Sequence, residues 1–182
     1  VKMIGISCSS VEEQIGWSED ILAVQGLERQ DKQLSFPIIS DKSRRLVTML
    51  GFIDPEEQDA AGRPVSARAL ILIGPDRTVK LSILYPATTG RNFREVLRAV
   101  DSVLLTGLYN LATPANWRPG DRCSVPPTSS TEDAEKQFCN LATEDLPSGK
   151  NYLRHVDCPK EIVVPEYAPM EPGAVVIAPP TK

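Results

Sequence analysis

The chain has 182 residues, of which 41% are hydrophobic and 24% are charged, and these values are typical of a globular protein. Its net charge of −4, with no basic stripe, argues against nucleic acid or an anionic membrane as a partner. Apolar runs such as Ala69 to Ile73 are far too short to span a bilayer. The length accommodates one medium-sized domain, or one domain with a small appendage.

The first residues predict a buried strand followed by a helix. Val1 to Ser7 is mostly apolar, and Val11 to about Gly26 carries apolar residues at helical spacing. Ser9 or Ser10 is a suitable N-cap for this helix. Because mature proteins seldom begin inside a core strand, we expect a further N-terminal segment before this strand. The alternative is a domain whose first strand is terminal.

A short strand and a second helix are predicted next. Phe36 to Ile39 is an apolar segment entered through a proline, which predicts a strand. Asp41 to Leu50 is predicted to be helical, with Asp41 or Ser43 as its N-cap and Gly51 at its end.

Two strands joined by a tight turn follow a polar segment. Asp54 to Arg63 is polar and rich in turn residues, so we predict a loop there. Ala67 to Ile73 is continuously apolar, and Val79 to Tyr85 is rich in β-branched and aromatic residues. Gly74 to Arg77 has the composition of a turn, and a hairpin is therefore predicted.

A long amphipathic helix comes after this hairpin. Its apolar residues follow a 3.6-residue repeat and are Phe93, Val96, Leu97, Val100, Val103 and Leu104. The predicted order of strand, helix, strand, helix, hairpin and helix indicates an α/β fold.

The C-terminal third differs from the preceding residues in composition and in the length of its predicted elements. Ala112 to Asp121 is a connector punctuated by prolines, and Asp121 to Val125 predicts a short strand. Thr131 to Phe138 predicts a short helix with an acidic first turn, and Leu146 to Arg154 predicts a turn followed by a strand. From Pro159 onward the density of prolines predicts an extended tail rather than a helix.

Several of these segments resemble one protein family. The block from Leu81 to Phe93, together with Phe36 to Ile39 and Gly74 to Asp76, resembles the one-cysteine, type-6-like branch of the peroxiredoxins, thiol peroxidases of thioredoxin fold. Trp117 and Pro147 to Lys150 resemble the small C-terminal domain of that family.

The resemblance implies an α/β fold of thioredoxin-like, peroxiredoxin type that lacks its first strand–helix section. It divides the chain into a thioredoxin-like domain at residues 1–107, a small C-terminal domain at 108–158 and a proline-rich tail at 159–182.

The resemblance also assigns supporting residues of a catalytic site. In the family the peroxidatic cysteine lies in a Pro-x-x-x-(Thr/Ser)-x-x-Cys turn, a motif that these 182 residues do not contain. Arg68 matches the arginine that contacts the peroxidatic thiolate, and Arg91 matches a second arginine that braces the first. As alternatives, Arg68 is a strand-edge arginine reaching water and Arg91 an ordinary residue before a helix. Trp17 resembles an aromatic residue of the pocket wall, or is simply a core residue.

The four cysteines do not by themselves indicate a site. Cys8 follows a strand and precedes a helix, and we interpret it as a half-buried small residue. Cys123, Cys139 and Cys158 are irregularly spaced, and with His155 as the only histidine they do not form a zinc pattern. A Cys123–Cys139 or a Cys139–Cys158 disulfide stays open. We expect no metal and no cofactor, and a reducing compartment, cytoplasmic or mitochondrial.

Some members of the family carry a phospholipase activity assigned to a Ser, a His and an Asp. Asp76 matches the Asp position, but as a residue it is an ordinary turn aspartate. His155 lies in the C-terminal part and suggests no Ser-His-Asp arrangement. We therefore do not extend this activity to the chain.

The sequence is compatible with three functions. The resemblance implies thiol-dependent reduction of hydrogen peroxide and organic hydroperoxides by the complete protein, with an external thiol as reductant and a homodimer formed through Val79 to Tyr85. The chain as printed is expected to be inactive alone. The first alternative is a catalytically inactive, peroxiredoxin-like structural or interaction subunit, and the second is a redox-sensing or chaperone-like module.

Overall fold

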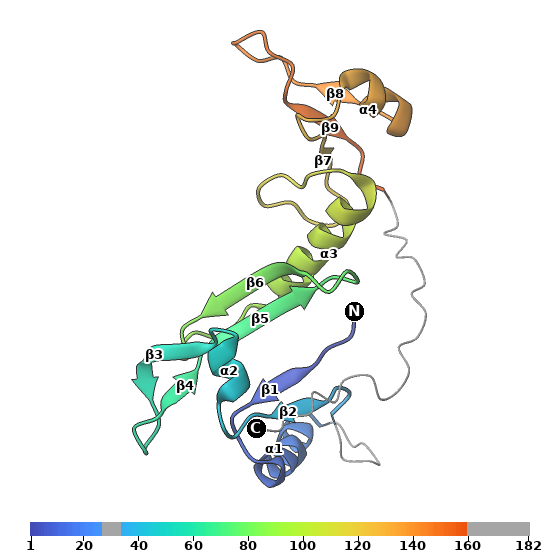
Figure 1. Ribbon diagram of the computed structural model, residues 1–182. Coiled ribbons are helices and arrows are strands. Elements are labelled where there is room, and N and C mark those ends of the chain that lie inside the picture. The colour runs from blue at the N-terminus through green and yellow to red at the C-terminus, as the bar shows by residue number, and fades with distance from the viewer. Residues whose placement is uncertain (27–33, 160–182) are drawn as a thin grey trace. The chain divides into compact units, whose positions relative to one another are not determined.

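The computed structural model describes residues 1–26 and 34–159 (Figure 1). The chain divides into two compact units, Val1–Asn92 and Phe93–Lys182, which are described separately below. The domain boundary expected after residue 107 stays a prediction. Nearly all of the expected proline-rich tail, residues 160–182, lies outside the described residues.

The first unit begins with a parallel strand pair and a helix. Strand β1, Gly5–Ser7, pairs in parallel with β2, Ile38–Ser40, and α1, Val11–Val24, lies between them in sequence (Figure 1). Ser10 is the N-cap of α1: its side chain accepts the backbone N–H of Glu13, while the Glu13 carboxylate accepts that of Ser10. This reciprocal capping box satisfies two backbone donors that the helix itself leaves unpaired, and the predicted N-cap is confirmed.

The second helix is shorter than predicted. Helix α2 spans Arg45–Met49, and its N-cap is Arg44, which has a left-handed φ of 59° and makes no side-chain cap. The prediction of Asp41 or Ser43 at the cap position was wrong. The Asp41 carboxylate nevertheless accepts the N–H of the third helical residue at 2.9 Å, so it stabilises the helix start from further upstream. Gly51, with φ of +71°, follows the last turn as predicted.

The segment predicted as a polar loop is a β-hairpin instead. Strands β3, Ile53–Gln58, and β4, Pro64–Ser66, pair in antiparallel register. The Asp59 carboxylate shapes the turn by accepting two backbone N–H groups, and it also forms ion pairs with Arg44 at 2.8 Å and Arg63 at 2.9 Å. The residues of β3 after its first two positions are exposed, so the hydrophobic alternation that reveals a half-buried strand is missing.

The predicted second hairpin is confirmed. Strands β5, Arg68–Ile73, and β6, Val79–Tyr85, run antiparallel with Arg68 opposite Tyr85 (Figure 1). The turn closes through the Gly74 N–H, which donates to the Thr78 carbonyl at 2.9 Å. Within residues 1–26 and 34–159, β6 pairs with β5 along one edge and with no strand along the other.

The second unit combines two helices with a small antiparallel sheet. Its elements are α3, Phe93–Tyr109; β7, Cys123–Ser124; α4, Thr131–Gln137; β8, Ala142–Thr143; and β9, Arg154–Val156. The strand order is β7-β9-β8. The predicted final strand starts later than expected, at Arg154.

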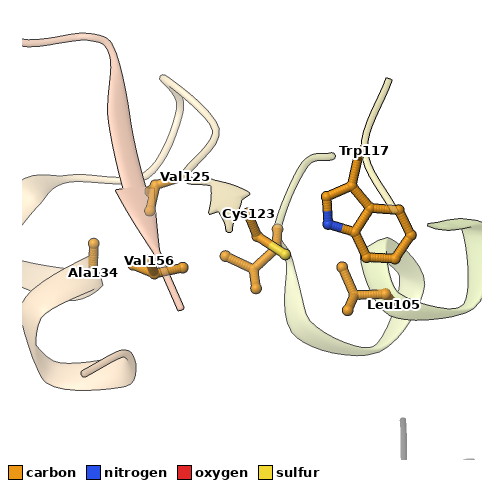
Figure 2. Packing of buried hydrophobic residues seen from close by; sticks show 7 residues of the cluster. Leu105, Trp117, Cys123, Val125, Ala134 and Val156 are labelled. Atoms are coloured by element: carbon orange, nitrogen blue, oxygen red, sulfur yellow. The ribbon is translucent and has the colours of Figure 1, made fainter. Parts of the chain in front are cut away.

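An apolar core fills the second unit (Figure 2). Its buried members come from α3, α4, β7, β9 and the segments between them. They are Leu105, Leu111, Trp117, Cys123, Val125, Ala134 and Val156. The Trp117 indole donates to the Asp121 carbonyl at 3.2 Å, so its polar edge is satisfied while the ring is buried.

Replacing Leu105 by Ala tests this core. Leu105 is 0% exposed, and removing its side chain is expected to lower the free energy of unfolding by about 2–5 kcal/mol, since a cavity is left behind. Urea unfolding followed by Trp117 fluorescence measures the loss. Leu97→Ala on the same helix is the matched control, because Leu97 is 64% exposed. An equal loss in both variants would contradict the assigned core.

Candidate functional site

Arg68 lies at the start of β5, on the exposed side of the second hairpin. Its Nε donates a hydrogen bond to the backbone carbonyl of Ala87, just after β6, at 2.9 Å. This bond uses one of the five N–H donors of the guanidinium group. It fixes the direction of the side chain relative to the turn that follows β6.

The same residue, Ala87, is held from its other side by Asp54. The Ala87 N–H donates to Asp54 Oδ2 at 2.7 Å, and the Glu56 N–H donates to Asp54 Oδ1 at 3.1 Å. Asp54 is only 6% exposed, so this carboxylate relies on backbone donors for the hydrogen bonds that water would otherwise supply. The N–H of Ala87, and after it that of Glu56, lower the pKa of Asp54.

Arg91 reaches the same strand from the chain that follows β6. Its Nη1 donates to the carbonyl of Ala69 at 3.4 Å. Ala69 is the residue directly after Arg68 in β5, so Arg91 hydrogen-bonds the main chain next to Arg68. A bracing role for Arg91 stays a prediction.

Trp17 and Cys8 lie in the first unit, near its first helix. Trp17 is 51% exposed, so its interpretation as a core residue was wrong. Its place in a pocket wall stays a prediction. Cys8 carries a free, half-buried thiol, as its interpretation as a small, partly buried residue expected.

The remaining three cysteines all carry free thiols, so neither considered disulfide is formed. Cys139 is exposed, whereas Cys123 is fully buried in the apolar cluster against which the half-buried Cys158 packs. Burial, and then the hydrogen bond and charge of Cys158, raise the pKa of Cys123 to about 12. Cys123 is therefore protonated at neutral pH and unsuited to be the thiolate that attacks a peroxide.

His155 has two polar neighbours that sequence reasoning missed. Its Nδ1 lies 3.4 Å from Ser124 Oγ, and its Nε2 lies 3.8 Å from Glu144 Oε1. Ser124 is its cross-strand partner on β7, and Glu144 directly follows β8. An activated nucleophile and its base are usually about 2.6–3.2 Å apart. We therefore assign these contacts to the sheet and not to catalysis.

Asp76, the other residue considered for hydrolysis, belongs to the β5–β6 turn. Its carboxylate accepts hydrogen bonds from Thr78 and an ion pair from Lys80 at 2.6 Å. Lys80 first, and then the backbone of Thr78, lower the pKa of Asp76 to about 2. These contacts serve the turn.

Residues 1–26 and 34–159 contain no group of three or more His, Cys, Asp or Glu side chains that could hold a metal ion. In this part of the chain no helix is both long and apolar enough to cross a membrane.

Comparison with known proteins settles the family. A family model described as the C-terminal domain of 1-Cys peroxiredoxin matches residues 109–141. The 1-Cys peroxiredoxin of Onchocerca volvulus is 50% identical over 165 residues, which cover 88% of this chain and 71% of that protein. The chain belongs to the 1-Cys peroxiredoxin family.

Solved structures agree with this assignment. The peroxiredoxin 6 of Arenicola marina matches with a TM-score of 0.83 and 48% identity, covering 88% of this chain and 72% of that one. The 1-Cys peroxiredoxin of yeast mitochondria matches with a TM-score of 0.71 and 31% identity, covering 86% and 70%. The fold is therefore thioredoxin-like, of peroxiredoxin type, with the small C-terminal domain of this family.

Asp54 is the residue of this peroxiredoxin hairpin that sequence reasoning overlooked. It fell in a segment predicted to be a loop, where an acidic residue is unremarkable. One signal in the sequence could have indicated that Asp54 is buried: it directly follows the apolar pair Phe52-Ile53. Its partner Ala87 is far away in sequence, so only the folded chain reveals the contact.

Replacing Asp54 by Asn is expected to destabilise the protein in a pH-dependent manner. Because the folded pKa of Asp54 is lowered, its stabilising effect is present above the ordinary value near 3.8 and is lost as the pH falls through the lower folded value. Urea unfolding of both proteins should show a stability difference at neutral pH that shrinks toward strongly acidic pH.

Glu57→Gln on the same strand is the control for this measurement, because Glu57 is exposed. It should unfold like the wild type across the same pH range. A stability difference between wild type and Asp54→Asn that stays constant with pH would contradict the assigned role of the Asp54 charge.

Proposed function

We propose that this peroxiredoxin acts as a thiol peroxidase that reduces hydrogen peroxide and organic hydroperoxides, with Arg68 beside the reacting thiolate. The observation that carries the proposal is the geometry of Arg68 in a chain of this family. Its Nε is fixed by the carbonyl of Ala87, whose N–H is held by the buried carboxylate of Asp54. The guanidinium is thereby oriented before any substrate arrives.

The proposed reaction transfers one oxygen atom to sulfur. A cysteine thiolate attacks one peroxide oxygen, the O–O bond breaks, and the other oxygen leaves with a proton as water or an alcohol. The cysteine becomes a sulfenic acid. A guanidinium beside the two oxygens stabilises the negative charge that develops on the leaving oxygen. We propose that Arg68 supplies this charge and that Arg91 supports it from the Ala69 carbonyl.

The nucleophile is the remaining requirement. None of the four printed cysteines lies in the family's Pro-x-x-x-(Thr/Ser)-x-x-Cys turn, and Cys123 is excluded by its raised pKa. We therefore propose the activity for a protein that carries this chain together with such a cysteine. The second candidate, a catalytically inactive interaction subunit, rests on the same absence of the motif from the printed residues.

A thiol from outside the chain is the proposed reductant. The solved structure of the yeast mitochondrial 1-Cys peroxiredoxin is described by a thiol resolving mechanism via glutathione and thioredoxin systems. By analogy we propose that a small or protein thiol of this type attacks the sulfenic acid here. A second thiol then releases the reduced enzyme, and the two external thiols leave as a disulfide.

We further propose a homodimer formed through strand β6. This strand has an edge that pairs with no strand of the described residues, and Leu84 on it is exposed. An unpaired edge presents a row of backbone N–H and C=O groups to any second strand. Antiparallel pairing of β6 with its copy would satisfy these groups in both protomers.

Replacing Arg68 by Lys tests the peroxidase. The lysine keeps the charge but loses the planar fork of donors, so the second-order rate constant for hydrogen peroxide should fall by roughly 100-fold. Stopped-flow peroxide consumption by the native protein, with glutathione in excess, measures this rate. Arg77→Lys, an exposed substitution in the β5–β6 turn, should retain the wild-type rate.

Two outcomes would separate the candidates. An unchanged rate in Arg68→Lys would show that Arg68 is not part of the catalytic site, while the proposed peroxidase activity would still stand. If the intact mass of the native protein equals that of the printed sequence and its peroxide consumption does not exceed that of free cysteine, the interaction subunit is favoured instead.

Lysine substitutions in β6 test the dimer. The double variant Ser82→Lys and Leu84→Lys places like charges along the edge, where they would face their copies, and should shift the protein from dimer to monomer. Light scattering coupled to size exclusion measures the mass. Val24→Lys, at the exposed end of α1, should leave the mass unchanged. A wild-type monomer at micromolar concentration would contradict the proposal.

A further inference from the structure

Two cysteines that sequence reasoning did not pair lie beside one another in the second unit. Strands β7 and β9 are antiparallel, with Cys123 opposite Val156. Cys158 is two residues beyond Val156, a spacing that returns a side chain to the same face of an extended segment. The chain leaving β9 stays against β7, because Arg122 forms an ion pair with Asp157 at 3.7 Å.

The two thiols lie in one apolar cluster but differ in their access to solvent. Cys158 is half-buried and packs against the apolar core that contains Cys123, close enough to be one cause of the raised pKa of Cys123. Cys123 is a fully buried member of that core, and Figure 2 shows its side chain among Val156, Val125 and the Trp117 and Leu105 side chains. A dissolved oxidant therefore reaches Cys158 and not Cys123.

We propose that Cys123 and Cys158 form a reversible disulfide when the protein is exposed to a hydroperoxide. This site is separate from the peroxidase site proposed above, and it needs no cysteine beyond those printed. The two sulfur atoms must approach to about 2.05 Å. Rotation of the half-buried Cys158 side chain supplies this movement, while the core holds Cys123 in place.

The chemistry balances in two steps. The Cys158 thiolate attacks a peroxide oxygen, the O–O bond breaks, and Cys158 becomes a sulfenic acid as water or an alcohol leaves. The Cys123 sulfur then attacks the Cys158 sulfur, the S–O bond breaks, and the oxygen leaves as water with the Cys123 proton. In total two thiols lose two electrons and two protons, and the hydroperoxide accepts both.

The environment of Cys123 supports this order of events. Its pKa is raised to about 12, first by burial and then by the hydrogen bond and the charge of Cys158. Cys123 therefore keeps its proton while Cys158 is reduced. When Cys158 is oxidised, the neighbouring Cys123 sulfur is its partner for the second step, in which the Cys123 proton leaves in the water that forms.

The disulfide would have two consequences for the domain. It would tie the chain leaving β9 covalently to β7 and so restrict the unfolded state of this part of the protein. It would also divert the Cys158 sulfenic acid from further oxidation to the sulfinic acid, which most cells do not reverse.

Peptide mapping after graded hydrogen peroxide treatment tests the proposal directly. Trypsin places these cysteines in separate peptides, Cys123–Lys136, Gln137–Lys150 and His155–Lys160. After alkylation of free thiols, the wild type should yield Cys123–Lys136 linked to His155–Lys160, with a loss of two hydrogens in intact mass that dithiothreitol restores. Oxidation should also raise the Tm by roughly 5 °C or more.

Two variants distinguish the pair from incidental oxidation. Cys139→Ser alters the exposed neighbouring cysteine and should give the same linked peptide as the wild type. Cys158→Ser should abolish it. Cys123→Ala should leave Cys158 without its partner, so that the peptide His155–Lys160 gains the two oxygens of a sulfinic acid; if this core variant does not fold, the other two variants still decide.

Three results would overturn the inference. The first is a linked peptide that contains Cys139 in place of Cys123 or Cys158. The second is cross-linking between chains without an internal link. The third is a wild-type protein in which Cys158 reaches the sulfinic acid while Cys123 stays a free thiol.

Discussion

The first unit depends on a carboxylate that the fold buries. Asp54 is charged in an almost fully covered position, and the N–H groups of Ala87 and Glu56 compensate for the water it loses. The Ala87 donor is available only when β3 and the chain after β6 come together. Arg68 then binds the carbonyl of the same Ala87, so the position of the family arginine follows from the way one buried charge is satisfied.

The second unit also buries a charged group, in this case a positive one. Arg154 is almost fully buried at the start of β9, and it donates to the carbonyls of Pro126 and Ser129 and to the Thr131 hydroxyl. These bonds connect β9 to the segment between β7 and α4 and to the start of α4. They surround the apolar core to which Cys123 belongs. In both units a buried ionic group ties segments that are distant in sequence, because part of its hydrogen bonding comes from residues far along the chain.

Because the chain belongs to the 1-Cys peroxiredoxin family, its arginines and cysteines are considered in terms of thiol redox chemistry. The guanidinium of Arg68 in the first unit is oriented by the backbone carbonyl of Ala87, which leaves its positive charge uncompensated by that partner. A guanidinium in that state favours an anionic neighbour such as a thiolate. The cysteines of the second unit are controlled differently, by burial and by mutual contact, so thiol chemistry there is confined to the partly exposed member of the pair.

The sequence by itself determined the features that depend on neighbouring residues: the strand Val79–Tyr85, the capping box of Ser10 and the left-handed Gly51 at the end of α2. Each of these is encoded within about one turn of chain, where propensity and capping decide. Only the tertiary structure decided that Asp54 holds Ala87 and that Cys123 meets Cys158 rather than Cys139. These contacts join residues far apart along the chain, so they form only when the whole fold brings their segments together.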